Sequence, residues 1–187
     1  VQIHSNASSS KGSNINVNSG SAVIEGYSIQ TGKKTSIQIL FENGLKLSMQ
    51  SDSKLKIIKL VNDFEGQNIP LIELEEGQFY FDGNLDQDLA QFKIQSGIIK
   101  LGSARGKITI NNEEAPFCRI HQSSGYSMFV NKLNKKVEIQ AGEKFVLETE
   151  KFRQKPEWIV MDQKEIANID KTIKKQNFNH SPIQWEI

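Results

Sequence analysis

The chain has 187 residues, of which 37% are hydrophobic and 24% are charged, a balance typical of a folded globular protein. Its 23 basic and 22 acidic side chains give a formal net charge of +1, so the overall charge provides no general attraction to nucleic acid or to anionic membranes. A single cysteine, Cys118, excludes an internal disulfide, and no apolar run approaches the roughly 18 residues that a membrane-spanning helix needs.

Residues 1–20 are rich in Ser, Asn and Gly and hold only isolated apolar positions. Such a composition buries too little apolar surface to offset chain entropy, so it predicts a flexible linker. The alternation of Ile15 and Val17 could form a short edge strand if a neighbour offered pairing. The chain opens on Val1 without the charged and apolar regions of a signal peptide, and we expect that an upstream targeting segment has been removed.

Alternating apolar positions fill residues 21–150 and predict a β domain. The clearest pattern lies at residues 31–49, where two alternating runs flank Asn43-Gly44, a dipeptide that favours a tight two-residue hairpin turn with positive φ angles. The positions of these runs that we expect to be buried are Ile37, Ile39, Phe41, Leu45, Leu47 and Met49.

Further short strands are expected along the same region, separated by glycine-containing turns. They lie at residues 22–26, 27–32, 54–61, 71–75, 78–81, 92–95, 98–101, 107–110, 117–121, 126–130, 136–140 and 144–150. Many short strands with such turns predict an all-β fold, which could be a sandwich, a barrel or a solenoid. No repeat of fixed length is present, so we expect an irregular β-solenoid or sandwich rather than a regular β-helix.

Residues 151–187 are predicted to form a C-terminal extension with one amphipathic α-helix at about 162–175. Asp162 and Glu165 have capping-box spacing at its start. Three isoleucines share one face, namely Ile166, Ile169 and Ile173. Three lysines suit the negative C-terminal end, namely Lys171, Lys174 and Lys175. A helix of this length is marginal in water, so we expect it to pack on the β domain rather than to face a partner.

Cys118 and His121 are the best candidates in the sequence for a metal site or for a nucleophilic Cys/His pair. Side chains three residues apart in a strand point to opposite faces, and a third and fourth ligand are missing, because His4 lies in the expected linker and His180 in the tail. We therefore expect a buried thiol and a surface imidazole.

The acidic and glycine-rich stretches also lack the sequence patterns of metal-binding or phosphate-binding sites. Asp82, Asp86 and Asp88 place oxygens at alternate positions, but the glycine and the closing glutamate of a calcium loop are absent, which favours a solvated turn. The same reading applies to the pairs Glu75/Glu76 and Glu113/Glu114. The segment 97–106 lacks phosphate-loop spacing, and its Arg105 is expected to be a turn residue. No catalytic, cofactor-binding or metal site is therefore assigned, and no cofactor is expected.

The order of the elements over about residues 20–150 resembles the FecR-type extracytoplasmic domain. The matching stretches are Thr31-Gly32, residues 36–41, Asn43-Gly44 with Leu45 to Leu47, residues 53–57, residues 74–81 with Gly77 at the turn, residues 92–96 and residues 137–143. This resemblance implies an irregular, solenoid-like all-β domain outside the cytoplasm without catalytic activity. The best-known members are the periplasmic halves of anti-sigma regulators that relay the occupancy of siderophore receptors, and the domain also occurs in other envelope proteins.

From these observations we expect a non-enzymatic protein-interaction module of the bacterial cell envelope, in signalling or in envelope assembly. Its partner would be another envelope protein, such as a receptor, a regulator or a structural component, bound by strand addition at an exposed sheet edge. We expect no nucleic-acid partner, and membrane contact only through an anchor upstream of Val1. The alternative is a carbohydrate- or peptidoglycan-binding module, which requires a groove lined by exposed aromatic residues. The candidates for such a groove are Tyr27, Tyr80, Tyr126 and Trp158.

Overall fold

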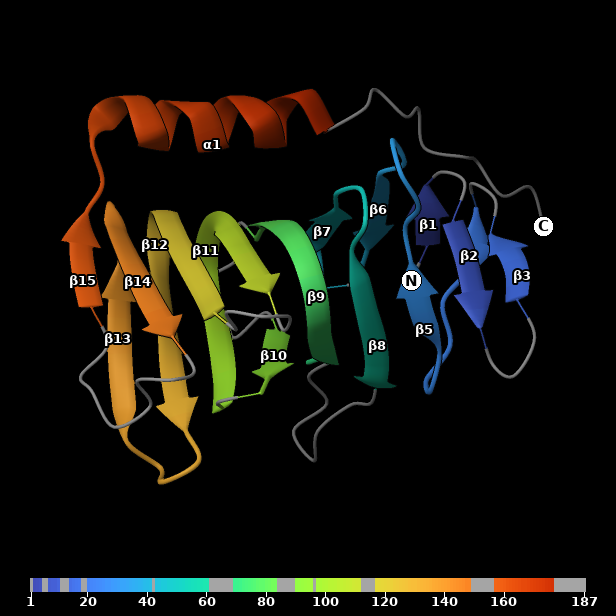
Figure 1. Ribbon diagram of the computed structural model, residues 1–187, viewed down its shortest axis with the longest axis horizontal. Coiled ribbons are helices and arrows are strands. Elements are labelled where there is room, and N and C mark those ends of the chain that lie inside the picture. Colours follow the sequence, from blue (N-terminus) through green and yellow to red (C-terminus); the bar gives the residue numbers. More distant parts are fainter. Residues whose placement is uncertain are drawn as a thin grey trace.

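The computed structural model describes residues 2–4, 7–10, 14–17, 20–41, 43–60, 69–83, 90–95, 97–111, 117–148 and 157–176. These residues form fifteen strands in one hydrogen-bonded sheet, together with one helix (Figure 1). The strands are β1 (Gln2–His4), β2 (Ala7–Ser10), β3 (Asn14–Val17), β4 (Ser21–Ala22), β5 (Ser28–Gln30), β6 (Ile37–Leu40), β7 (Lys46–Met49), β8 (Lys54–Lys59), β9 (Leu71–Asp82), β10 (Ala90–Ile94), β11 (Gly97–Asn111), β12 (Phe117–Asn131), β13 (Lys136–Gln140), β14 (Glu143–Glu148) and β15 (Glu157–Val160). The helix is α1 (Gln163–Gln176), which is not long and apolar enough to cross a membrane.

The sheet is folded into two layers, because three long strands each contribute one half to each layer. Layer A has the order β3-β2-β5-β8-β9-β10-β11-β12-β13. Layer B has the order β4-β1-β6-β7-β9-β11-β12-β14-β15. The shared strands are β9, β11 and β12, and the described neighbours are antiparallel except β9 and β10. The predicted all-β architecture of solenoid or sandwich type with a C-terminal helix is confirmed.

The main hydrophobic core lies between the two layers. Phe81 of layer B and Phe92 of layer A meet edge-on, with ring centroids 6.2 Å apart. Phe129 of layer A and Phe145 of layer B lie 5.4 Å apart. All six hairpin positions that alternation predicted to be buried are at most 3% exposed. Period-2 patterning therefore identified the inward face of this part of layer B correctly.

The hairpin of β6 and β7 has a longer turn than Asn43-Gly44 predicted. The Phe41 N–H donates to the Leu45 carbonyl at 2.9 Å, so three residues rather than two lie between the paired positions. Gly44 has a φ of +83°, and the Asn43 side chain accepts a bond from the Leu45 N–H at 3.3 Å. A positive-φ glycine in the third position is typical of the three-residue hairpin loop, in which it forms a bulge.

Several pairs of predicted short strands are single long strands that bend. The stretches 71–75 and 78–81 are the two halves of β9, which bends at Gly77, where φ is +105°. β12 joins 117–121 to 126–130 in the same way and includes Gly125, with a φ of +69°. The Ser53 hydroxyl accepts a bond from the Gln78 N–H at 3.1 Å beside the first bend. The glycines that seemed to end strands thus carry them from one layer to the other.

The prediction of a flexible linker over residues 1–20 is wrong for the described part, which forms β1, β2 and β3. β1 pairs with β6 and β4, and β2 pairs with β5, so backbone hydrogen bonds to existing strands replace the apolar burial that the composition lacks. The edge strand expected from Ile15 and Val17 is present as β3, at the end of layer A. The boundary between this segment and the domain at residue 21 stays a prediction.

α1 begins one residue after its predicted start and packs on the outer face of layer B, as Figure 1 shows along the upper side of the molecule. The Asp162 carboxylate accepts a bond from the Glu165 N–H at 2.7 Å and caps the helix. Ile169 and Ile173 are about 5% exposed and form a small cluster with Tyr80 and Met161, separate from the main core. The expectation that the helix packs on the β domain is confirmed.

We predict that Gly77→Ala destabilises the fold by on the order of 3 kcal/mol or more. An added Cβ would lie 2.2 Å from Ser53 Oγ and 2.5 Å from Ser53 Cα, and a positive φ adds its own strain. Gly26→Ala is the matched control, because Gly26 has a φ of +83° but no atom within 4 Å of the added Cβ, so about 1 kcal/mol of φ strain is expected there. Urea unfolding of both variants measures the difference, and equal losses would contradict a packed bend.

Candidate functional sites: the face beneath the helix and the strand edges

The outer face of layer B presents a row of polar side chains beneath α1. Tyr80, Lys107, His121 and Lys144 lie in register on β9, β11, β12 and β14. Each alternates with a core residue on its own strand, so all four point away from the core. α1 therefore rests on a face that carries two lysines and an imidazole.

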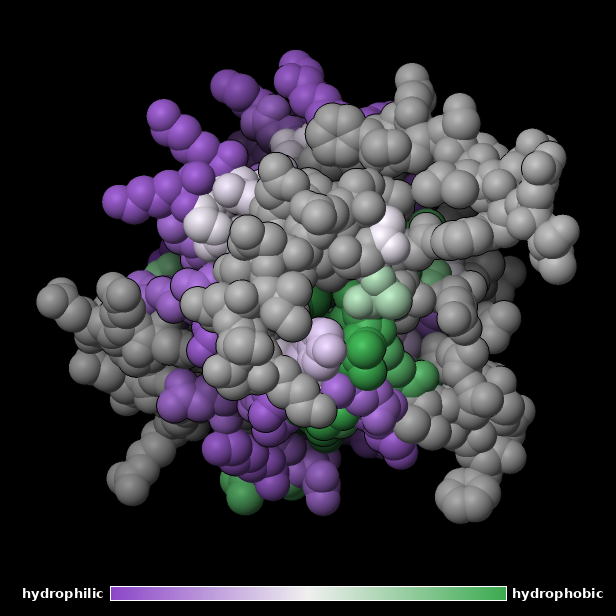
Figure 2. Space-filling view, turned by 90° about the vertical axis from the view of Figure 1, so that its right-hand side faces the viewer, coloured by the Kyte–Doolittle hydropathy of each residue, from purple (hydrophilic) through white to green (hydrophobic). Residues whose placement is uncertain are grey.

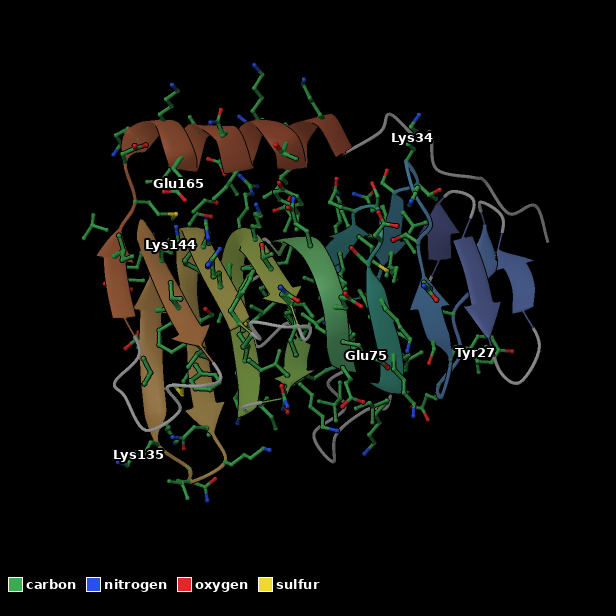
Figure 3. The ribbon with its side chains drawn as sticks, in the orientation of Figure 1. Tyr27, Lys34, Glu75, Lys135, Lys144 and Glu165 are labelled. Carbon is green, nitrogen blue, oxygen red and sulfur yellow. The ribbon has the colours of Figure 1, made fainter. Side chains whose placement is uncertain are left out.

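One carboxylate of α1 contacts two members of this row. Glu165 Oε1 lies 3.0 Å from His121 Nδ1 and 3.8 Å from Lys144 Nζ, and Figure 3 shows Glu165 above Lys144. Burial, together with the charges of Lys144, Lys107 and Arg119, lowers the pKa of His121 to about 4. The imidazole is therefore neutral at pH 7 and donates its Nδ1–H to the carboxylate.

Further contacts hold the rest of the helix. Asp170 Oδ1 accepts a bond from the Ser123 hydroxyl at 2.9 Å. Lys107 Nζ lies 5.8 Å from the centroid of the Tyr80 ring, and burial lowers the pKa of this lysine. Burial also raises the pKa of Tyr80, against the opposing effect of hydrogen bonds with Thr172 and Gln78. Polar contacts thus run along α1 from Glu165 in its first turn to Thr172.

Cys118 and His121 lie on opposite faces of β12, as their spacing predicted. Cys118 belongs to the core between the layers, where burial raises the pKa of its thiol to about 12. His121 is only 9% exposed, so the predicted surface imidazole is wrong. No local pattern indicated this burial, because the covering helix α1 begins 42 residues after His121.

The acidic candidates are dispersed in cross-strand ion pairs. Glu75 pairs with Lys54 at 2.6 Å on the outer face of layer A, and Asp82 pairs with Arg105 at 2.9 Å. Arg105 is thus a strand residue of β11 with an ionic partner, not a turn residue. Asp86, Asp88, Glu113 and Glu114 lie outside the described residues. Within the described ranges, no group of three or more His, Cys, Asp or Glu side chains could hold a metal ion.

The aromatic candidates for a glycan-binding groove do not come together. Tyr80 is 8% exposed beneath α1, whereas Tyr126 is 45% exposed and lies against Gly102. Tyr27 is half-buried next to β5, at the opposite end of the molecule from β12 (Figure 3). The side chain of Trp158 is outside the described part. The described aromatic residues therefore form no shared groove.

The two layers end on one side in β13 and β15, and the described residues show no strand paired beyond either of them. The Asn131 N–H bonds to the Lys135 carbonyl at 3.0 Å, so the register turns the backbone of Lys136 and Glu138 outward on β13. This edge carries Lys135, Lys136 and Glu138, all exposed, and the outward N–H of Gln140 already bonds to the Glu143 carboxylate at 2.8 Å. Such charged edges discourage pairing.

The side chains that the structure describes at the edge of β15 are apolar. The Met161 N–H bonds to the Gly142 carbonyl at 2.7 Å, so by the same register argument the backbone groups of Trp158 and Val160 face away from β14. Ile159 is 46% exposed and Val160 is 83% exposed. β15 is therefore an apolar edge with free backbone donors and acceptors among the described residues.

At the opposite end of the molecule the outermost described strands are β3 and β4. Figure 2 looks at this end, where hydrophilic residues project from the upper side and hydrophobic residues gather near the centre. Layer A ends there in β3, whose side chains are outside the described part, and layer B ends in β4, which has only two residues. Short edge strands are a common protection against pairing.

Comparison with known proteins agrees with this architecture. The family model described as "FecR protein" matches residues 27–118. Two crystal structures of a "putative anti-sigma factor" from Parabacteroides distasonis ATCC 8503 superpose with TM-scores of 0.57 and 0.58 at 12% sequence identity. They cover 75% of this chain, which spans only 62% of their length, and at this identity the likeness is one of fold. No curated protein matches the sequence.

The chain is thus a two-layer β protein with one helix packed on the outer face of layer B. Residues 27–118 match the FecR family model, and the predicted resemblance is confirmed over this range.

We predict that the burial of His121 makes the fold less stable in acid. Unfolded histidine binds a proton near pH 6.5, whereas folded His121 stays neutral until about pH 4. Between these values the unfolded state binds more protons, so the free energy of unfolding falls as the pH falls, by up to about 3 kcal/mol.

The test compares urea unfolding at several pH values for the wild type and His121→Asn, which keeps a donor and does not titrate. The variant should lose less stability between pH 6.5 and 4. Parallel pH profiles would contradict a neutral buried imidazole.

We further predict that Cys118 is inert in the folded protein. A buried thiol with a raised pKa has almost no thiolate at pH 8, and the thiolate is the reactive species. An aromatic disulfide reagent should therefore label one thiol in urea and none without it, at rates that follow unfolding. Rapid labelling of the native protein would contradict the assigned burial.

Proposed function

We propose that the chain is the non-catalytic, extracytoplasmic protein-interaction part of a bacterial signalling regulator of the anti-sigma type. The FecR-family domain and the fold shared with the anti-sigma-factor structure support the signalling role. The observation that carries the interaction role is the apolar edge of β15, next to the charged edge of β13. The candidate reactive groups support a non-enzymatic role, because the thiol is buried and the carboxylates are paired.

Strand addition at β15 is the proposed mode of binding. A partner segment beside β15 would exchange hydrogen bonds with the outward backbone groups of Trp158 and Val160. Its side chains on one face would cover Val160, and those on the other would lie beside Ile159. Each backbone hydrogen bond contributes about 1 kcal/mol net, so burial of the two apolar side chains supplies much of the affinity.

We predict that Val160→Pro weakens partner binding about tenfold or more without unfolding the domain. Proline removes the outward N–H of residue 160, while the β14 bonds formed by Ile159 and Met161 remain. Glu138→Pro is the matched control, because it removes an outward N–H from the charged edge of β13. Circular dichroism and thermal melting establish that both variants are folded.

The experiment uses wild-type, Val160→Pro and Glu138→Pro domains as baits in a bacterial envelope extract, with capture quantified by mass spectrometry. A receptor or sigma-regulating protein held by the wild type and Glu138→Pro but lost by Val160→Pro is the expected result. Equal capture by all three baits would contradict strand addition at β15. Capture of structural envelope proteins alone would contradict the signalling role, as would retention only on isolated cell wall.

A further inference from the structure

The acidic side chains of α1 form contacts within the domain, whereas its lysines lie on the exposed side of the helix. Each carboxylate has an internal contact: Asp162 caps the helix, Glu165 contacts His121, and Asp170 bonds to Ser123. The four lysines of the helix are all exposed, and none forms an ion pair with a described residue. They are Lys164, Lys171, Lys174 and Lys175, and we call them the lysine face.

The lysine face is held outward by the packing of the helix. Ile169 and Ile173 are buried against Tyr80, so α1 cannot turn its apolar side to a partner without leaving layer B. Eleven residues separate the first and last lysine, which at 1.5 Å per residue gives a cationic stripe of about 16 Å. Figure 3 shows side chains with nitrogen tips projecting upward from the helix.

The same side of the molecule continues the positive charge beyond the helix. Figure 3 places Lys34 on the upper side past the C-terminal end of α1, and its neighbour Lys33 is also exposed. On the described helix and its cap, Asp162 is the one exposed carboxylate, because Glu165 and Asp170 are half-buried. The four exposed lysines therefore outnumber the exposed acids of this described segment.

We propose that the lysine face lies against an anionic lipid bilayer. All of its cations are lysines, which act as hydrated point charges and suit a fluid layer of phosphates better than fixed carboxylates. Within α1, Ala167 is the one exposed apolar residue among those described, so the outward side of the helix lacks the apolar anchors that give protein interfaces their affinity. Adsorption is electrostatic and without insertion, because the apolar side of α1 remains on layer B.

The proposal goes beyond the binding of a partner at β15 and does not depend on it. A lysine near an anionic membrane increases partitioning about fivefold, so loss of three lysines should weaken adsorption about 100-fold. The attraction should be strong at about 0.01 M salt, where the Debye length is about 30 Å, and absent at about 1 M, where it is about 3 Å.

The test is co-sedimentation of the whole chain with phosphatidylglycerol/phosphatidylcholine vesicles and with pure phosphatidylcholine vesicles. The test variant is Lys164→Gln/Lys171→Gln/Lys175→Gln, in which glutamine keeps the helix propensity. The control variant removes the same charge from three exposed lysines on the outer face of layer A, as Lys56→Gln/Lys100→Gln/Lys136→Gln. Helix content is checked by circular dichroism.

The expected result is low-salt binding of the wild type and the control to the anionic vesicles only, with about 100-fold weaker binding of the test variant. No binding of the wild type at low salt would overturn the proposal, as would an equal loss in both variants. Tighter binding to soluble polyglutamate than to vesicles would also overturn it, in favour of an acidic protein partner. None of these outcomes changes the Val160→Pro comparison, which reports on β15 alone.

Discussion

The bends of the three shared strands are the constraint on which the rest of the structure depends. A strand that leaves one layer and enters the other must turn its backbone sharply while remaining paired on both sides, and glycine permits this where a side chain would collide. At Gly125 an added Cβ would lie on top of the Ser103 carbonyl, and at Gly77 it would meet Ser53. The bends of β11 and β12 lie against each other, because the register of this pair shifts between Leu101 and Ala104 on β11, where Ser103 meets Gly125 of β12.

The bends also determine what α1 covers. Beyond Gly77, β9 presents Tyr80 on the outside of layer B, in line with Lys107 and His121, and the helix packs across this line. The neutral state of His121 allows α1 to pack on this face. A protonated His121 would be a third cation beside Lys107 and Lys144, and Glu165 is the carboxylate of α1 that contacts this row. Burial that disfavours the charged imidazole and the docking of the helix therefore support each other.

The sequence predicted those features that depend on local pattern. The alternation of the β6–β7 hairpin, the cap at Asp162 and the apolar face of α1 are each decided within a few residues, and all are present. Features that depend on distant partners were missed. At Gly77 the sequence suggested a turn that ends a strand, whereas the structure has a bend within β9. A glycine is typical of both, so the local sequence does not distinguish them. β1 and β2 lack apolar patterning and exist through pairing with other strands, and His121 is buried by a helix that begins 42 residues later.

The sheet edges and charged surfaces that remain available for binding were the features least predictable from the sequence. A net charge of +1 indicates no electrostatic partner, but folding places each carboxylate of α1 in an internal contact and leaves Lys164, Lys171 and Lys175 outside. Residues 136–140 were predicted as a strand, whereas the strand at residues 157–160 was not predicted. On both strands only the register identifies which backbone groups are turned outward. Binding by this fold depends on which backbone groups and charged side chains are left without a partner inside the folded domain. Residue types alone do not show which groups these are.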